Sequence, residues 1–253
     1  MAFETDRRPL AAAYDTTARA DAAPIDAGLR TYMLRVYNYM ASGLFLSGLV
    51  ALLVANNEGL RDAFFKVTET GRFAGYTGLG LVAVFAPIGL LLAMSFGQQR
   101  MKTTTLQTLY WGFVALMGVG LSVVLMVYTG VSVTRVFFIT SAAFGGLSLY
   151  GYTTKRDLSG FRSFLVMGLI GLLIASVVQM FFPSAMMHFL ISVVGVLLFA
   201  ALTAHDTQAI KNQYLTIRGS SYEDSSAIMG AVNLYLDFIN LFQFLMSLVG
   251  QRR

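Results

Sequence analysis

Apolar residues form seven long runs along the chain, and polar residues gather mainly at the breaks between these runs. Each run holds about 20 residues, which at ~1.5 Å rise per residue is enough for a helix to cross a bilayer core of about 30 Å. No Asp, Glu, Lys or Arg occurs between Arg162 and Asp206, and Phe182-Pro183-Ser184 divides this stretch into two runs. The pattern predicts seven transmembrane helices, over residues 36–55, 76–96, 106–127, 133–152, 163–182, 185–206 and 227–249.

The last run, Ala227 to Val249, has a carboxylate near its middle, at Asp237. A carboxylate at that depth costs ~2.5–3.5 kcal/mol on insertion scales, so it normally faces protein or a wet cavity and indicates a function. At 100° per residue the small and polar residues of this run fall within one narrow stripe, which consists of Gly230, Asn233, Asp237, Asn240 and Ser247. Because apolar residues cover the other directions, the run predicts a central helix that lines a path or a site.

Composition is typical of a polytopic membrane protein. Hydrophobic residues make up 56% of the chain and charged residues 12%, whereas soluble domains carry about 25% charged residues. We therefore expect one all-α integral membrane domain over residues 31–253. Residues 1–30 are polar and Ala-rich, carry both signs of charge and lack the apolar core of a signal peptide, so they predict a disordered cytoplasmic tail.

The distribution of basic residues predicts the orientation of the chain. With seven spans and the N-terminus inside, the inner segments hold twelve Lys or Arg residues and the outer segments hold six. This asymmetry predicts a cytoplasmic N-terminus and an outer C-terminus. Basic residues spread over short loops do not predict nucleic-acid binding, and the absence of Cys excludes disulfide and thiolate chemistry. The outer six are Arg61, Lys66, Arg72, Arg135, Arg252 and Arg253.

Asp206 is the second acidic residue in an apolar run, at the inner end of the sixth. The residues after it permit the helix to continue, which would bring Asp206 to a depth similar to that of Asp237 on the next helix. Two carboxyl groups close together in a low dielectric cannot both ionise at low cost, so we expect them to share a proton and titrate as a unit. Losing that proton would separate the helices and leave a site attractive to a cation. Two plainer interpretations stay open: Asp206 as an interfacial helix-end residue, and Asp237 as a structural hydrogen-bond acceptor.

The remaining polar candidates have weaker signals. Arg100 follows the second run on the inner side, and it either reaches a carboxylate of the pair as a latch or anchors the helix at the inner surface. Arg135 is interpreted as an interfacial residue at the outer surface. His205 points about 100° away from Asp206 on a helix, so it and His188 are interpreted as packing or interfacial residues. No group of convergent His or Glu ligands predicts a resident metal.

Three stretches resemble bacterial members of the Bax inhibitor-1 family, the transmembrane Bax-inhibitor-motif proteins. They read TRVFFITSAAFGGLSLYGYTTKRDLSGF, FAALTAHDTQAIK and NLYLDFINLFQFLMSL, and the similarity extends over about residues 30–250. The resemblance implies seven helices, six of them surrounding a central seventh, and a bacterial inner-membrane location. It also implies a pH-sensitive calcium leak gated by Asp206 and Asp237, with an arginine of the second span, matched nearest by Arg100, beside the pair.

We therefore expect a pH-regulated cation leak channel, with calcium the transported ion, and not an enzyme. Asp206, Asp237, Asn233 and Asn240 supply the hard oxygen ligands that suit transient calcium binding, and no cofactor is expected. The alternatives are a proton-coupled transporter that uses the same aspartates, and an accessory membrane protein that binds a protease or another complex. An intramembrane aspartyl protease is disfavoured because its Gly-x-Gly-Asp string is missing, and a retinal protein because all four lysines lie in predicted loops. The expected partners are thus the lipid bilayer, calcium and protons, with a membrane-protein partner left open.

Overall fold

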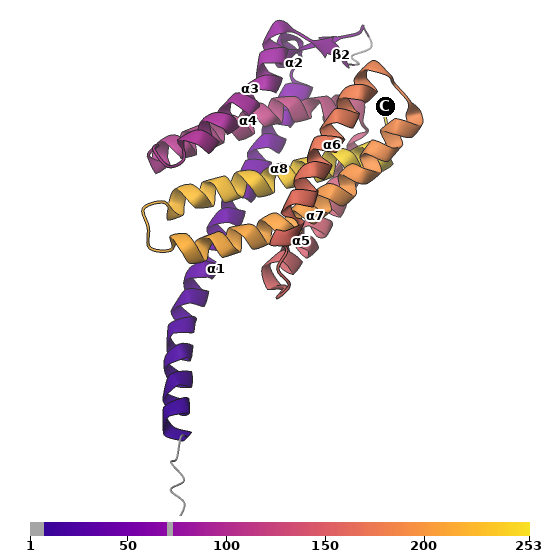
Figure 1. Cartoon of the computed structure of the whole chain (residues 1–253). Coiled ribbons are helices and arrows are strands. Elements are labelled where there is room, and N and C mark those ends of the chain that lie inside the picture. The colour runs from indigo at the N-terminus through magenta and orange to yellow at the C-terminus, as the bar shows by residue number, and fades with distance from the viewer. Residues whose placement is uncertain (1–7, 70–72) are drawn as a thin grey trace, which may run out of the picture.

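The computed structural model describes residues 8–69 and 73–253 (Figure 1). In this part of the chain seven helices are long and apolar enough to cross a membrane, and each coincides with one predicted run. The prediction of an all-α membrane fold with seven spans is therefore confirmed. The spanning helices are α1 (Arg8–Asn56), α3 (Gly78–Gly97), α4 (Thr103–Val127), α5 (Gly130–Thr153), α6 (Arg162–Phe181), α7 (Ala185–Ile217) and α8 (Glu223–Val249).

Helix α1 reaches well beyond its apolar part. It begins at Arg8, while its candidate membrane span begins at Ala27, and Figure 1 shows its N-terminal part projecting away from the other helices. Residues 8–30, which were expected to belong to a disordered tail, are thus drawn as helix. Residues 1–7 lie outside the described residues, so the disorder of the tail stays a prediction.

Helix α7 continues three turns past the end of the sixth apolar run and ends at Ile217. This extension follows from a sequence without Gly or Pro and from two side chains that bind the last turn of α5 and the loop after it. Lys211 donates from Nζ to the carbonyl of Tyr152 at 2.7 Å, and Gln208 donates to the carbonyl of Arg156 at 2.8 Å. Asp206 therefore lies within α7 and not at its end.

A small layer of structure between α1 and α3 was not predicted. Asn57 caps α2 (Glu58–Phe64), which is followed by β1 (Phe65–Val67) and β2 (Phe73–Tyr76), an antiparallel pair. The rings of Phe65, Phe73 and Tyr76 pack edge to face with centroids 5.1–5.8 Å apart. This burial raises the pKa of the Tyr76 hydroxyl. Elements this short carry no long apolar run, so the pattern of the sequence did not indicate them.

Helix α8 is the most buried of the spans. Half of its apolar window is buried, against 11–39% in the other six, and it packs against α1, α4, α5 and α7. The remaining two spans pack mainly elsewhere, since α3 lies against α4 and α6 against α7. A central position for α8 fits this burial, but a complete ring of six helices around it is not confirmed.

Side-chain hydroxyls tie the helices together where no water is available. Ser47 of α1 donates to the carbonyl of Val114 on α4 at 2.6 Å and lies 2.7 Å from the Tyr235 hydroxyl on α8. A second chain joins α1, α5 and α7 through Tyr37, Ser148 and Thr207, whose hydroxyl oxygens are 2.6 and 2.9 Å apart in turn. These hydroxyl groups thereby have hydrogen-bond partners inside the bundle.

Close contact between the backbones of α1 and α4 requires a glycine at position 118. A Cβ on Gly118 would lie 2.7 Å from the carbonyl oxygen of Ser47 and 2.8 Å from the Cβ of Val50, whereas a Cβ on Gly120 would meet nothing within 4 Å. The two glycines are both in α4, yet only Gly118 permits the backbones to approach.

We predict that Gly118→Leu lowers the thermal stability of the detergent-solubilised protein while Gly120→Leu does not. Overpacking a tight contact costs about 1–3 kcal/mol, so the unfolding midpoint of Gly118→Leu should fall by several degrees. Differential scanning fluorimetry of the two variants beside the parent measures this difference. Equal midpoints for both variants would show that α1 and α4 are not in close contact at Gly118.

Candidate functional site

The most unusual side chain of the bundle is Asp237 on α8. The residue is 5% exposed, and its Oδ2 is one of two buried side-chain polar atoms in the described residues that lack a hydrogen-bond partner. A buried carboxylate without a partner is costly, because folding removes its hydration and gives nothing in exchange. The predicted role of Asp237 as a structural hydrogen-bond acceptor therefore has no support from its contacts.

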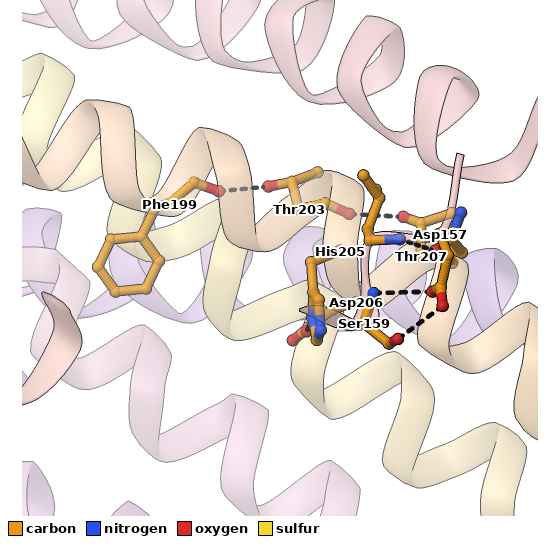
Figure 2. A network of polar contacts seen from close by, with 9 residues as sticks. Asp157, Ser159, Phe199, Thr203, His205, Asp206 and Thr207 are labelled. Atoms are coloured by element: carbon orange, nitrogen blue, oxygen red, sulfur yellow. Dashed lines mark hydrogen bonds and ion pairs between the residues drawn. The ribbon is translucent and has the colours of Figure 1, made fainter. Parts of the chain in front are cut away.

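Asp206 lies on α7, the helix that packs against α8, and is less buried. Its side chain is 23% exposed, and its Oδ1 lies 2.7 Å from Nδ1 of His205; Figure 2 shows the two side chains on the same side of α7. The expectation that His205 points away from Asp206 was wrong. Neighbouring residues differ by about 100° at their Cα atoms, but the two side chains bend toward each other and their polar ends meet.

Asp206 and Asp237 are electrostatic neighbours across α7 and α8. The charge of Asp206 acts on the Asp237 carboxyl, and His205 and Arg162 in turn act on Asp206. No hydrogen bond joins the two carboxyl groups in the described residues, so a shared proton is not seen in this structure. The two acidic side chains were predicted to meet, and the structure supports only an interaction between their charges.

The hydroxyls beside Asp206 are used by α7 itself. Thr203 donates to the carbonyl of Phe199 and Thr207 to that of Thr203, both at 2.8 Å (Figure 2). Such bonds back to the preceding turn satisfy the hydroxyl inside the helix. The side of α7 next to Asp206 therefore offers polar atoms without offering free donors to the carboxylate.

The loop before α6 is bound to α7 near Asp206. Asp157 accepts hydrogen bonds from the backbone N–H and the hydroxyl of Ser159, both at 2.9 Å, and these bonds lower the pKa of the exposed Asp157 carboxyl (Figure 2). Gln208 of α7 accepts from the N–H of Leu158 at 2.7 Å. Arg162, at the start of α6, is thereby placed where its charge reaches Asp206.

Three other predicted site residues form no hydrogen bond or ion pair with the carboxyl pair in the described residues. Asn240 donates to the carbonyl of Leu236 in its own helix at 2.8 Å. Asn233 is exposed. Arg100 follows α3, is exposed and forms no ion pair within the described residues. Its role as a latch stays a prediction, and Arg162, which the sequence analysis did not consider as a site residue, is the arginine whose charge acts on Asp206.

A second polar cluster joins α7 and α8 toward their other ends. Ser247 lies 2.8 Å from Ser192 and 2.8 Å from Nε2 of His188. Between this cluster and the carboxyl pair, aromatic rings fill the space between α7 and α8: the Phe244 ring stacks on the Phe199 ring, with their centres 5.8 Å apart. The same ring faces Gly195, where a Cβ would lie 2.6 Å from it.

The carboxyl pair can hold protons or a weakly bound hard cation. Carboxylate oxygens are preferred ligands of calcium, which takes 6–8 oxygens, and the pair supplies only part of such a shell. In residues 8–69 and 73–253 no group of three or more His, Cys, Asp or Glu side chains gathers to hold a metal ion. The arrangement thus suits transient passage of a cation better than tight storage.

Comparison with known proteins identifies relatives over nearly the whole chain. Residues 29–253 match a family model described as "Inhibitor of apoptosis-promoting Bax1". The chain is 48% identical over 236 residues to a protein of Caulobacter vibrioides, covering 93% of this chain and 94% of that one. It is 40% identical over 229 residues to the inner membrane protein YbhL of Escherichia coli, covering 90% and 94%. A Rickettsia prowazekii protein is 44% identical over 228 residues, covering 90% and 92%.

We predict that Asp237→Asn raises the thermal stability of the purified protein at neutral pH. The amide removes a charge that the surrounding helices do not compensate, so the midpoint should rise by a few degrees, corresponding to about 1–3 kcal/mol. Asp62→Asn is the control, because Asp62 is exposed and surface substitutions change stability by at most about 0.5 kcal/mol. A large fall in the midpoint of Asp237→Asn would reveal a partner of the carboxylate that the contacts do not show.

Proposed function

This chain belongs to the Bax inhibitor-1 family, and we propose that it is a passive, pH-regulated cation leak of a bacterial inner membrane, with calcium as the transported ion. The inner-membrane location is supported by the Escherichia coli relative, which is named an inner membrane protein. A cytoplasmic N-terminus is supported by the excess of Lys and Arg in the segments assigned to that side. The activity is one of conduction and requires no catalytic residue.

The observation that carries this proposal is the unpaired Oδ2 of Asp237, buried in α8 within reach of the Asp206 charge. When both carboxyl groups are ionised, their repulsion is strong in a low dielectric, and the pair attracts a hard cation. When one carboxyl group is protonated, both the repulsion within the pair and its attraction for a cation weaken. The protonation of the pair thus sets how readily a cation enters between α7 and α8.

The contacts between α7 and α8 support a closed conformation. Phe244 of α8 packs against Phe199 and Gly195 of α7, two turns from Asp237 along α8. Beyond this aromatic contact lies the polar cluster of His188, Ser192 and Ser247. Separation of α7 from α8 would move the rings apart and join the two polar regions into one path.

A proton-coupled transporter is the second candidate, because the two carboxyl groups differ in access. Asp237 is buried, while the Asp206 side chain is 23% exposed, as expected of a carrier whose sites load in turn. Calcium flux that is driven by an imposed pH gradient would favour the transporter, whereas flux set by the pH itself favours the leak. An accessory membrane protein would instead co-purify with a stable partner.

We predict that calcium flux into liposomes containing the parent protein rises between pH 5 and pH 8, and that Asp237→Asn reduces flux and its pH dependence. Asn cannot ionise, so the variant lacks the charge pair at every pH. Entrapped calcium indicator measures the flux, with Asp62→Asn as control because the Asp62 side chain is 55% exposed on α2, outside the contact between α7 and α8. Equal flux through the parent and Asp237→Asn at every pH would contradict the proposal.

We further predict that Phe244→Ala increases calcium flux at pH 5, where the parent conducts least. Removing the ring opens the contact with Gly195 and Phe199 without changing any charge. Phe164→Ala is the matched control, because Phe164 of α6 is 71% exposed and lies outside the contact between α7 and α8. An unchanged flux through Phe244→Ala would mean that the aromatic contact does not close the path.

A further inference from the structure

An apolar cavity of about 320 Å³ opens between α1, α4, α5 and α8, away from the carboxyl pair. It exists because α4 and α5 diverge from the short turn at Tyr128 and Thr129: α4 packs against α1 and α3, whereas α5 packs against α7 and α8. Gly48 and Gly130 line the cavity, and a Cβ on either would meet nothing within 4 Å. The helices therefore leave space that no side chain of the described residues fills.

The rim of this cavity is open to the side of the bundle. Leu52 of α1 and Phe137 of α5 both line it and are 52% and 43% exposed. An apolar cavity of this kind does not hold water. In a protein whose helices cross a bilayer, the apolar groups that can enter from the side are lipid acyl chains. From Leu44 to Leu52 the cavity follows α1 for eight residues, which corresponds to roughly 12 Å.

The outer end of the cavity continues into a basic chamber. Leu52, Leu125 and Gly130 line both the cavity and a second hollow of about 210 Å³, whose lining includes Arg61 and Arg253. Within residues 8–69 and 73–253 the Arg61 guanidinium uses only Nε, which donates to Asp62 at 2.9 Å, although a guanidinium has five N–H donors. In the described residues no hydrogen bond or ion pair uses the Arg253 side chain.

The position of Arg253 is fixed by backbone bonds to the turn between α4 and α5. The N–H of Arg253 donates to the carbonyl of Val127 at 3.0 Å, and the N–H of Thr129 donates to that of Gln251 at 2.9 Å. The Arg252 guanidinium lies 5.9 Å from the centre of the Tyr128 ring. The segment after α8 is thus held at the mouth of the chamber, at the membrane face where α1 ends.

We propose that this cavity and chamber form a binding site for one anionic phospholipid. One acyl chain occupies the cavity between α1, α4, α5 and α8, and the headgroup phosphate binds Arg61 and Arg253. The two hollows together have the size of usual ligand pockets, about 300–1,000 Å³, and arginine is the side chain best suited to bind phosphate. The site shares no residue with the carboxyl pair, so it stands whether or not the chain conducts calcium.

The test is native mass spectrometry of the delipidated, detergent-solubilised chain titrated with phosphatidylglycerol, with phosphatidylcholine of the same acyl chains, or with glycerol phosphate. We expect one phosphatidylglycerol per protomer, bound about tenfold more tightly than phosphatidylcholine, because each arginine near an anionic lipid contributes several-fold. Glycerol phosphate, which lacks acyl chains, should not bind measurably. Equal affinity for the two phospholipids in the parent would overturn the proposal.

Two kinds of variant separate the headgroup from the acyl chain. Arg61→Gln combined with Arg253→Gln should reduce the affinity for phosphatidylglycerol to that for phosphatidylcholine. Gly48→Leu fills the cavity and should weaken binding of both lipids several-fold. If Gly48→Leu does not fold, Gly130→Leu fills the same cavity from α5 and replaces it in the test. The controls are Arg135→Gln, an exposed arginine near the same membrane face, and Gly120→Leu, which does not line the cavity. Unchanged phosphatidylglycerol affinity in either kind of variant, or an equal loss in its control, would contradict the site.

Discussion

A carboxylate enclosed by apolar helices, with one oxygen that no donor of the described residues reaches, is the constraint on which the rest of this bundle depends. Most other hydroxyl and amide groups between the helices have partners: Ser47 bonds Val114 and Tyr235, and Thr207 bonds Thr203 and Ser148. Asp237 Oδ2 has none. The cost of such a group in a low dielectric must be offset by the packing of α8, the most buried span. A site that is expensive to fold and is not compensated by contacts is typical of function and not of structure.

The same constraint explains why α7 is built as it is. Its hydroxyls bond back to carbonyls of the preceding turn, so none of them donates to Asp237. Lys211 and Gln208 bind the loop between α5 and α6 and extend α7 beyond the apolar run. This extension carries Asp206 into the bundle beside Arg162 and His205. Asp206 therefore has His205 beside its Oδ1 and the charge of Arg162 acting on it, while among the described residues only the charge of Asp206 acts on Asp237.

The spans and both aspartates could be predicted because they depend on quantities that the sequence carries directly: the length of an apolar run and the rarity of charge within it. The contacts of Arg100, Asn233 and Asn240 could not. A stripe on a helix fixes which residues share a face, but packing sets the rotation and depth of that face, so Asn233 is exposed while Asp237 is buried. Likewise His205 meets Asp206 through side-chain bending that no spacing rule includes. The hairpin of β1 and β2 is too short to leave a periodic signal.

Helix α8 is the element shared by the two proposed sites. Asp237 is turned toward the charge of Asp206 on α7, while the next residue, Phe238, lines the apolar cavity between α1, α4 and α5. A movement of α8 relative to α7 that opens the aromatic contact must also change the shape of that cavity, because packed helices move as units. A ligand shifts an equilibrium only by the difference in its affinity for the two states. A phospholipid bound against Phe238 and Phe242 contacts α8, which moves in this rearrangement, and also α1, α4 and α5, which can stay in place. Its affinity therefore differs between the closed and the separated arrangement, which couples the lipid environment to the carboxyl pair through a single helix.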